Sequence, residues 1–353
     1  MANNSRNTIV QRQEAIVSFI KSQKKATRDE IQSHITPIFP QSSKLTILRD
    51  LDVLSSDGKI FKNGKSRGIF YTAYSSPILE TLDVDKYFTI PSDERKLAFD
   101  SFNFDIWNNL CNLLSKKEKE YLATINNKYI KSRHNLSPLA IKKEIERITI
   151  ELSWKSSQIE GNTYTLLDTE ELIKGGIEAK GKSHEEAIMI LNHKKAIEFV
   201  FAQPDFFATI TLTKIEDLHR LLTTELDVDF GIRNYKVGIT GTKYKPLDNK
   251  YQIKEAMEQL ASMINTTENV VEKAMIAVLM ISYIQPFVDG NKRTARILGN
   301  AILMAGGYCP LSYRSVSEID YKKAMLMFYE QNSAYHFKQI FVEQFKFAVE
   351  TYF

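Results

Sequence analysis

Apolar residues near the start of the chain recur at helical spacing, and this pattern predicts three short helices. Ile16, Phe19 and Ile20 mark one face of the first, expected over residues 8–22. The capping-box sequence Thr27-Arg-Asp-Glu30 predicts that the second begins at Thr27 and runs to about residue 34. The third is expected from residue 42 or 43, with a leucine at every third position, and ends at the turn of residues 57–58.

After the third helix the pattern changes to two short strands. They are expected at residues 59–62 and 68–73, and the intervening Asn63-Gly64 pair is a strong hairpin signal. Three helices followed by a hairpin resemble a winged helix-turn-helix. In that arrangement the third helix enters the DNA major groove and the hairpin lies near the phosphates.

Charge favours a polyanionic partner for this N-terminal module. Residues 1–75 contain 12 basic and 6 acidic side chains, whereas the remaining residues are nearly neutral. The side chains suited to contact DNA are on the third helix and on the hairpin: Lys44, Thr46, Arg49, Lys62, Lys65 and Arg67. The alternative is a winged helix used for protein–protein contact or dimerisation.

From about residue 104 onward the apolar spacing is mostly helical, so we predict a mainly α fold. Between Tyr235 and Leu247 the pattern alternates and contains glycines, which predicts a short hairpin. We expect these parts along the chain: a winged-helix module of α+β type at 1–75, a linker at 76–100, an N-terminal helical part at 101–210, and a helical core at 211–353.

Composition indicates in which cellular compartment the protein is expected. Two cysteines, Cys111 and Cys309, lie far apart in sequence, which argues against a disulfide framework and for a reducing compartment. The longest apolar run, residues 274–284, is shorter than the roughly 20 residues that a membrane helix needs. We therefore expect a cytoplasmic protein without a membrane partner.

The most informative stretch is Gln285-Pro-Phe-Val-Asp-Gly-Asn-Lys-Arg-Thr-Ala-Arg296. It follows an uncharged and therefore buried helix, and it begins a second helix. Amide groups at a helix N-terminus bind phosphate, and Arg293 and Arg296 lie on one face where they can bind further phosphate oxygens. Asp289 can hold Mg²⁺ against those phosphates. The residues favour a nucleotide-phosphate site; the alternative is a capped helix whose arginines form structural ion pairs.

The same stretch resembles the signature of the Fic family, His-x-Phe-x-(Asp/Glu)-Gly-Asn-Gly-Arg-x-x-Arg. Phe287, Asp289 and Gly290 are in register, as are Asn291 and both arginines. Two positions depart from the signature, since Gln285 replaces the histidine and Lys292 replaces the usual glycine. Lysine at the second position also occurs in the related death-on-curing toxins.

Two further segments extend the resemblance over roughly residues 150–335. Ser156, Glu160 and Gly161 match the inhibitory motif (Ser/Thr)-x-x-x-Glu-(Gly/Asn) of the family, at 156–161. The predicted hairpin matches the flap on which target proteins dock, at residues Ile239, Thr240, Gly241, Thr242, Lys243 and Tyr244.

The resemblance implies ATP and Mg²⁺ as ligands and AMP transfer to a Ser, Thr or Tyr hydroxyl of a target protein. Asp289 would hold the metal, and Gly290 and Asn291 the α and β phosphates. Arg293 and Arg296 would bind the outer phosphates, next to Lys292, and Arg296 would also pair with Glu160 in the inhibited state. The family histidine accepts the proton of the attacking hydroxyl, which Gln285 cannot do, because an amide has no usable basicity.

Three functions remain open: a transferase with weakened base catalysis, an inactive nucleotide sensor that acts through DNA, and a phosphotransferase like the death-on-curing toxins. Many relatives form dimers, so a second copy of the chain is a further candidate partner. Residues 176–183 fit the Walker A pattern, but they follow a polar helix and not a buried strand. The six histidines show no metal-ligand spacing, and we expect each to be structural.

Overall fold

The computed structural model describes residues 2–23, 25–56, 59–64, 68–73 and 77–353. Contacts divide the chain into two compact units. The first unit contains the residues up to Ser76 together with Leu114–Glu120, and the second contains Pro77–Leu113 and Tyr121–Phe353.

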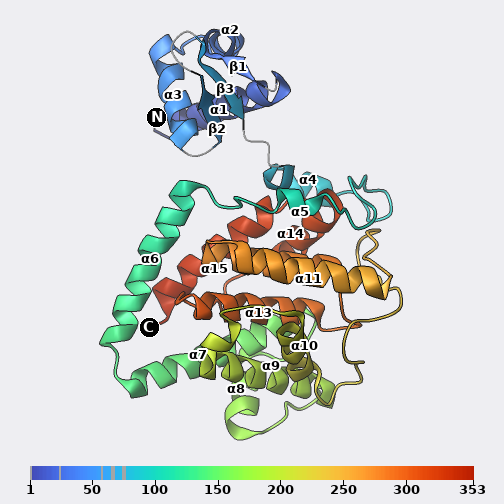
Figure 1. Cartoon of the computed structure of the whole chain (residues 1–353). Coiled ribbons are helices and arrows are strands. Elements are labelled where there is room, and N and C mark those ends of the chain that lie inside the picture. Colours follow the sequence, from blue (N-terminus) through green and yellow to red (C-terminus); the bar gives the residue numbers. More distant parts are fainter. Residues whose placement is uncertain (1, 24, 57–58, 65–67, 74–76) are drawn as a thin grey trace. The chain divides into compact units, whose positions relative to one another are not determined.

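The first unit combines three helices with a small antiparallel sheet (Figure 1). Its elements in chain order are α1 Ala2–Gln23, β1 Ala26–Thr27, α2 Arg28–Ile38, α3 Lys44–Ser56, β2 Ile60–Asn63 and β3 Phe70–Ala73. β3 lies between β1 and β2, with Ala26 opposite Tyr71 and Ile60 opposite Ala73. The three predicted helices and the two predicted strands are all present, with β1 as an addition.

A compact apolar core explains these elements. It contains Ile16, Ile20, Ile31, Ile35, Ile47, Leu51, Leu54, Ile60 and Tyr71. The predicted capping box is confirmed, because the Thr27 amide donates to Glu30 Oε2 at 2.7 Å and the Glu30 amide donates to Thr27 Oγ1. A buried ion pair, Arg12 Nε to Asp50 Oδ2 at 2.5 Å, connects α1 to α3.

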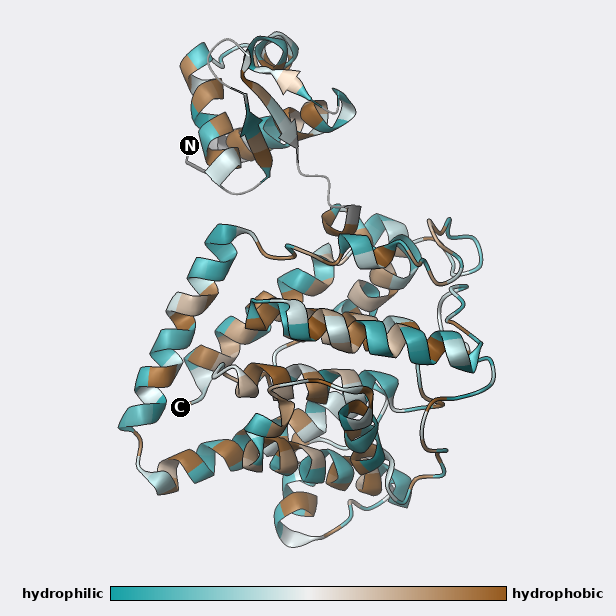
Figure 2. Cartoon of the chain, in the orientation of Figure 1, coloured by the Kyte–Doolittle hydropathy of each residue, from teal (hydrophilic) through white to brown (hydrophobic). Residues whose placement is uncertain are grey.

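The second unit is almost entirely helical, as predicted. Its elements in chain order are η2 Pro77–Leu79, α4 Val84–Phe88, α5 Ile106–Asn109, the part of α6 (Lys116–Asn135) from Tyr121 onward, α7 Pro138–Ile159, α8 Leu166–Gly175, α9 His184–Ala202, η3 Pro204–Phe207, α10 Leu212–Thr223, α11 Lys250–Thr266, α12 Val270–Ile284, α13 Asn291–Ala305, α14 Glu318–Gln331 and α15 Tyr335–Thr351. Hydrophilic and hydrophobic residues alternate along α6 and α11, the pattern of helices with one face in solvent (Figure 2). Among the described residues, no helix is long and apolar enough to cross a membrane.

Helices α12 and α13 form the centre of this unit. Every side chain from Ala274 to Ile284 is buried, as the absence of charge predicts. The two helices approach closely at Gly299, where a Cβ atom would lie only 2.8 Å from Val278 Cγ2. The loop that joins them is therefore anchored by two buried helices.

Residues 77–100, expected to be a linker, lie within the second unit. Arg95 is buried and pairs with the fully buried Glu330 of α14, with Nη2 at 2.8 Å from Oε1. The Ala98 amide donates to the Glu330 carbonyl at 2.9 Å. A buried charge needs such a partner, so the ion pair fixes this segment on α14.

Candidate functional site

The candidate site is the loop between α12 and α13 together with the first turns of α13. Gly290 adopts a left-handed conformation, with φ of 77°, immediately before α13. A Cβ atom there would lie 3.2 Å from Thr223 Cγ2 and 3.4 Å from His219 Cδ2, so glycine is needed for both conformation and space. Among the residues that the structure describes, no side-chain hydrogen bond caps the helix at Gly290. The helix N-terminus is therefore suited to an anion.

The Asn291 side chain stabilises the loop by hydrogen bonds to other loop residues. Its Nδ2 donates to the Phe287 carbonyl at 2.8 Å, and its Oδ1 accepts from the Phe287 amide at 2.8 Å. Nδ2 also donates to Gln285 Oε1 at 3.0 Å. Asn291 and Phe287 are both buried, so these bonds form away from competing water.

Gln285 takes part in the same hydrogen-bond network. Its backbone is left-handed, with φ of 51°, and its side chain is 8% exposed. Nε2 donates to the Ser282 carbonyl at 2.7 Å while Oε1 accepts from Asn291. Both ends of the amide are thus engaged within the loop.

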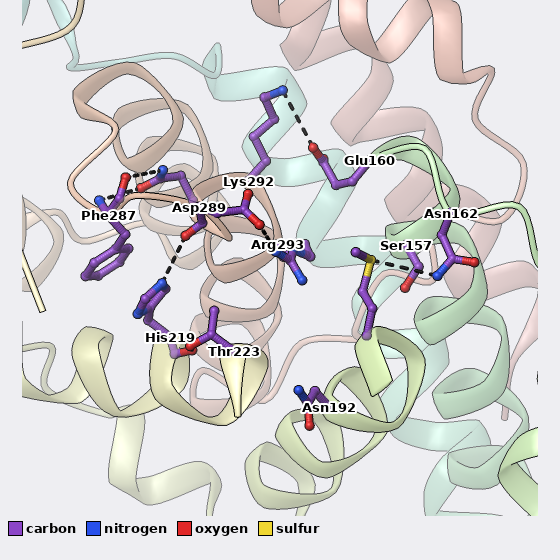
Figure 3. Close-up of polar contacts among 12 residues, drawn as sticks. Ser157, Glu160, Asn162, Asn192, His219, Thr223, Phe287, Asp289, Lys292 and Arg293 are labelled. Atoms are coloured by element: carbon purple, nitrogen blue, oxygen red, sulfur yellow. Dashed lines mark hydrogen bonds and ion pairs between the residues drawn. The ribbon is translucent and has the colours of Figure 1, made fainter. Parts of the chain in front are cut away.

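His219 of α10 supports the loop from below (Figure 3). Its ring stacks on Phe287 with the centroids 3.8 Å apart, and Nε2 lies 3.0 Å from the Asp289 carbonyl oxygen. The sequence indicated a structural histidine but gave no signal for this contact, because 70 positions separate the two residues. His219 therefore helps to fix the backbone that precedes Gly290.

Arg293 lies in the first turn of α13 and is almost completely buried. Its Nη2 donates to Asp289 Oδ2 at 2.6 Å, a pair that Figure 3 shows beside the start of α13. Its Nη1 is buried and has no hydrogen-bond partner among the residues that the structure describes. An unpartnered buried cation donor is costly. This donor is suited to an additional anion or a water molecule.

Arg296 is held by the inhibitory-motif segment at the end of α7. Its Nε donates to Ser156 Oγ at 2.9 Å, and its Nη2 donates to the Ser156 carbonyl at 2.8 Å. Its Nη1 pairs with Glu160 Oε1 at 2.8 Å. The ion pair expected between Glu160 and Arg296 is therefore present. Gly161, the last residue of the motif, has φ of 101° and allows the chain to turn after α7.

A second cation approaches the same carboxylate. Lys292 Nζ lies 3.6 Å from Glu160 Oε2, and Figure 3 shows the lysine reaching from α13 toward this glutamate. Burial alone raises the pKa of Glu160, but the charges of Arg296 and Lys292 outweigh this and leave the pKa below its ordinary value. Glu160 is consequently an anion held between two cations.

Two buried histidines that are affected by the charge of Arg293 are neutral at physiological pH. Burial and the charge of Arg293 lower the pKa of His193 to about 3, and they lower that of His219 to about 4, both from an ordinary 6.5. His193 Nε2 lies 3.0 Å from Ser156 Oγ, so this ring supports the serine that holds Arg296. His219 thus positions the Asp289 backbone, and His193 positions Ser156.

We expect acid to destabilise the fold through these histidines. Their pKa values are lower in the folded than in the unfolded chain, so the free energy of unfolding falls as the pH drops below 6.5 and levels off only near pH 4 to 3. At pH 5 each histidine should lower the free energy of unfolding by about 2 kcal/mol relative to pH 8. Urea unfolding of the native chain and of His219→Gln at both pH values measures this loss. His134→Gln, at an exposed position, is the control; an equal pH slope in all three proteins would contradict the prediction.

Asp289 presents the carboxylate at this loop that could serve as a metal ligand. Its side chain is 64% exposed, although one oxygen is engaged by Arg293. No group of three or more candidate metal-ligating residues occurs among the described residues. Mg²⁺ usually takes one or two carboxylates, with phosphate and water oxygens completing its shell. A single carboxylate therefore fits an ion that arrives with the nucleotide.

The predicted flap hairpin is wrong in its secondary structure. Residues 239–244 form an extended segment with a turn at Gly241, and within the described chain the pairing near it is a single parallel bridge between Lys245 and Ser101. Side chains satisfy its backbone in place of a partner strand, since the Gly241 carbonyl accepts from Arg95 and the Leu247 carbonyl accepts from Arg233. Alternation and glycines were therefore insufficient evidence for a hairpin.

The segment is nevertheless fixed to the core near the loop. The Tyr244 hydroxyl donates to the Tyr283 carbonyl at 3.0 Å, and the two rings stack. Arg233 Nε donates to the Gln285 carbonyl at 2.7 Å, and Lys243 Nζ donates to the Asp93 carbonyl at 2.8 Å. Arg233 thus connects the segment to the first residue of the candidate loop.

The candidate DNA-contacting residues of the first unit are partly described. Lys44 and Arg49 of α3 are exposed, and Thr46, half-buried, shares a hydrogen bond with Ser43. Lys62 on β2 is exposed. Lys65 and Arg67 lie outside the described residues.

Residues 176–183, which fit the Walker A pattern, do not form a phosphate site. Lys182 Nζ donates to the carbonyl and hydroxyl oxygens of Thr163, at 2.8 and 3.0 Å. Ser183 caps α9 in a capping box with Glu186. The lysine and the serine of this segment therefore already have structural partners.

Comparison with known proteins finds relatives in the family that the loop sequence resembles. A family model described as the Fic/DOC family matches residues 209–303. Protein adenylyltransferase Fic of Drosophila melanogaster is 33% identical over 161 residues, which cover 45% of this chain and 33% of that protein. Protein adenylyltransferase fic-1 of Caenorhabditis elegans is 26% identical over 223 residues, covering 59% and 44%. The chain therefore spans about a third of the length of the Drosophila relatives that it matches.

Solved structures show the same fold. Fic-1 from C. elegans superposes with a TM-score of 0.58 at 21% identity, covering 66% of this chain and 71% of that one. A Fic-domain-containing signaling protein from Bacteroides thetaiotaomicron gives 0.53 at 19% identity, covering 66% and 96%. The helical unit thus has the fold of Fic-domain proteins. The part of this unit that matches the Fic/DOC family model is residues 209–303.

Proposed function

We propose that this chain binds ATP at the N-terminus of α13 and transfers AMP to a hydroxyl group of a target protein, slowly and under inhibition by Glu160. One observation supports this more than any other. Lys292, Arg293 and Arg296 gather at an uncapped helix N-terminus, where they are paired with Glu160 and Asp289. Such a concentration of cations and helix amides is suited to a polyphosphate.

Each part of the loop then has a role in binding. The α and β phosphates lie on the backbone of Gly290 and Asn291, while the arginines bind the outer phosphates. Arg293 Nη1, buried and unpartnered among the described residues, gains an acceptor. Mg²⁺ at Asp289 would neutralise phosphate charge. The segment Ile239–Tyr244, fixed beside the loop, supplies the docking surface for the target.

Inhibition follows from the position of the Glu160 carboxylate. It occupies Arg296 Nη1 at 2.8 Å, so this donor is not available to a phosphate oxygen. Its negative charge also repels the outer phosphates. Binding of the nucleotide in a productive position therefore requires that Glu160 move away from Arg296.

Weak catalysis follows from Gln285. The target hydroxyl attacks the α phosphorus, the bond to the β phosphate breaks, and pyrophosphate leaves. The hydroxyl proton must pass to solvent, because neither end of the Gln285 amide can accept it. A positioned general base contributes about 10²- to 10⁴-fold. Orientation and charge stabilisation remain, so slow transfer is expected.

Labelled ATP tests the reaction. The Glu160→Gly chain is incubated with Mg²⁺ and either α- or γ-labelled ATP, and the protein is examined for incorporated label. AMP transfer labels the protein only from α-labelled ATP. Label that comes only from the γ position identifies a phosphotransferase, the alternative suggested by Lys292. Absence of both labels, together with measurable ATP binding, leaves a nucleotide sensor.

The nucleotide sensor is the second candidate, because both ends of the Gln285 amide are engaged inside the loop. In this function ATP binding controls the first unit, which we propose to be a DNA-binding winged helix. The order of its helices and its β1-β3-β2 sheet support this, together with the exposed Lys44 and Arg49 on α3.

We expect the full chain to bind duplex DNA with an affinity that decreases steeply as salt increases. Because Lys44 and Arg49 would bind phosphates, the double variant Lys44→Ala/Arg49→Ala should bind more weakly at every salt concentration. The slope of log affinity against log salt should fall by about one for each phosphate-binding side chain removed. Fluorescence anisotropy measures both quantities. Lys254→Ala, on exposed α11 of the other unit, is the control; unchanged binding by the double variant would favour protein–protein contact for this module.

A further inference from the structure

Lys292 occupies an unusual position for a cation. It is the second residue of α13, in the first turn of the helix, where unpaired amide groups already create positive potential. Arg293 follows it directly, and Arg296 lies one turn further on, so three cations surround this helix start. Cations are unfavourable at such a position unless an anion is close. In the structure that anion is Glu160, 3.6 Å from Lys292 Nζ.

The two cations that interact with Glu160 differ in how firmly their side chains are held. Arg296 is completely buried, and Ser156 binds two further nitrogens of its guanidinium group. Lys292 is 30% exposed, and its distance to Glu160 is longer than a hydrogen bond. A lysine is a point charge on a flexible stem with three donors. Lys292 can therefore turn to another anion, whereas Arg296 is held where it is.

We propose that Lys292 has two successive partners: Glu160 in the resting protein and the terminal phosphate of the nucleotide once Glu160 has moved. This inference rests on the proposed function and deepens it. In the resting protein Lys292 stabilises the inhibitory position of Glu160. In the bound state the same ammonium group interacts with the phosphate that replaces the carboxylate. Lys292 thus opposes nucleotide binding in one state and supports it in the other.

A simpler interpretation is a surface ion pair with no role in binding. Partly exposed pairs contribute little to stability, commonly less than about 1 kcal/mol. The two interpretations differ in what happens when Glu160 is absent. A surface pair would then leave Lys292 without any effect on ATP, whereas the proposal requires that its removal weaken binding.

A double-mutant cycle with Lys292→Met separates them. Calorimetry measures the Kd for ATP with Mg²⁺ in two backgrounds, native Glu160 and Glu160→Gly. With Glu160→Gly, Lys292→Met should weaken ATP binding by about tenfold, because the variant cannot form a charge-assisted hydrogen bond to phosphate. With Glu160 present the weakening should be only about two- to fivefold, because the loss of one cation that holds the carboxylate makes Glu160 easier to displace and offsets part of the loss. The effect of Lys292→Met should therefore be clearly smaller when Glu160 is present.

ADP identifies the phosphate that Lys292 binds. In the Glu160→Gly background, Lys292→Met should weaken ATP binding clearly more than ADP binding, since ADP lacks the terminal phosphate. Lys254→Met, which removes a lysine paired with a glutamate at 3.8 Å on α11, should alter neither ligand in either background.

Failure of the proposed function and failure of the role of Lys292 give different results. Absence of ATP binding by Glu160→Gly alone overturns the proposed function, and the role of Lys292 with it. ATP binding with an equal effect of Lys292→Met in both backgrounds, or no effect without Glu160, overturns only the role of Lys292. Equal weakening of ATP and ADP places the lysine on the inner phosphates and overturns the assignment to the terminal one.

Discussion

Replacement of Glu160 by glycine is expected to tighten ATP binding by at least about tenfold. The carboxylate lies 2.8 Å from Arg296 and 3.6 Å from Lys292, in the space proposed for the outer phosphates. Its removal frees both cations and eliminates a negative charge. Two unit charges 4 Å apart interact by about 4 kcal/mol at an effective dielectric of 20. Solvent screening at the partly exposed Glu160 reduces this, and tenfold corresponds to about 1.4 kcal/mol.

The same variant should be less stable without ligand. Arg296 is fully buried, and removal of its counter-ion leaves a buried charge supported only by Ser156 and the ring of Tyr321 among the described residues. Thermal unfolding should therefore begin at a lower temperature in the absence of ATP. Added ATP with Mg²⁺ should raise the Tm more in the variant than in the native chain, because a ligand stabilises according to its affinity.

A matched control separates this effect from the general cost of a glycine. Glu178 is also engaged by a side chain, with Oε1 at 2.7 Å from His184 Nδ1, but it lies in the loop between α8 and α9. Glu178→Gly should leave the Kd for ATP unchanged. An unchanged Kd in Glu160→Gly as well would show that the ion pair with Arg296 is structural and that the inhibitory role is wrong.

The sequence predicted those parts of the fold that depend on local pattern. The uncharged run that became α12 and the capping box at Thr27 are examples, because periodicity and capping involve residues that are close along the chain. The position of Glu160 against Arg296 could also be predicted, although 136 residues separate them, since the family motifs specify both. Local signals and motif spacing thus account for most helices and for the main ion pair.

Interactions that depend on tertiary packing could not be predicted. The bonds of Gln285 to Ser282 and Asn291 require the left-handed backbone at the end of α12, which no side-chain pattern indicates. Arg95 appeared to belong to a linker, because its partner Glu330 is 235 positions away. The flap segment alternates like a hairpin, yet the side chains of Arg95 and Arg233 satisfy its backbone. In each case a distant polar partner decided the local structure.

The bonds of Gln285 also determine what a histidine at this position can do. A neutral imidazole donates through one nitrogen and accepts through the other. It can therefore retain the bond to the Ser282 carbonyl and replace Oε1 as the acceptor for Asn291. If the second nitrogen turns to an attacking hydroxyl, Asn291 still keeps its two bonds to the Phe287 backbone. The loop should consequently tolerate Gln285→His.

We expect Gln285→His, combined with Glu160→Gly, to raise AMP transfer at least about tenfold above Glu160→Gly alone. Histidine supplies a group that titrates near neutral pH at the point of attack, and an optimally placed base contributes about 10²- to 10⁴-fold. Only the neutral imidazole accepts a proton, so the rate should rise with pH through a value near 6.5. Self-modification with α-labelled ATP across a pH series measures both the rate and its pH dependence.

Gln285→Leu in the same background is the matched control, because it removes the amide bonds without adding a base. A rate increase in both variants would mean that release of the loop, and not a base, accelerates transfer. The Kd for ATP must be measured for each, because Lys292 lies at the start of α13 where the family signature has glycine, and its side chain can crowd the phosphates. If the histidine variant binds ATP as tightly as its parent yet transfers no AMP, the position of the base is not what limits this site. Phosphate transfer or nucleotide sensing would then be the better account, because the remaining departure from the signature, Lys292, acts on phosphate and not on the hydroxyl.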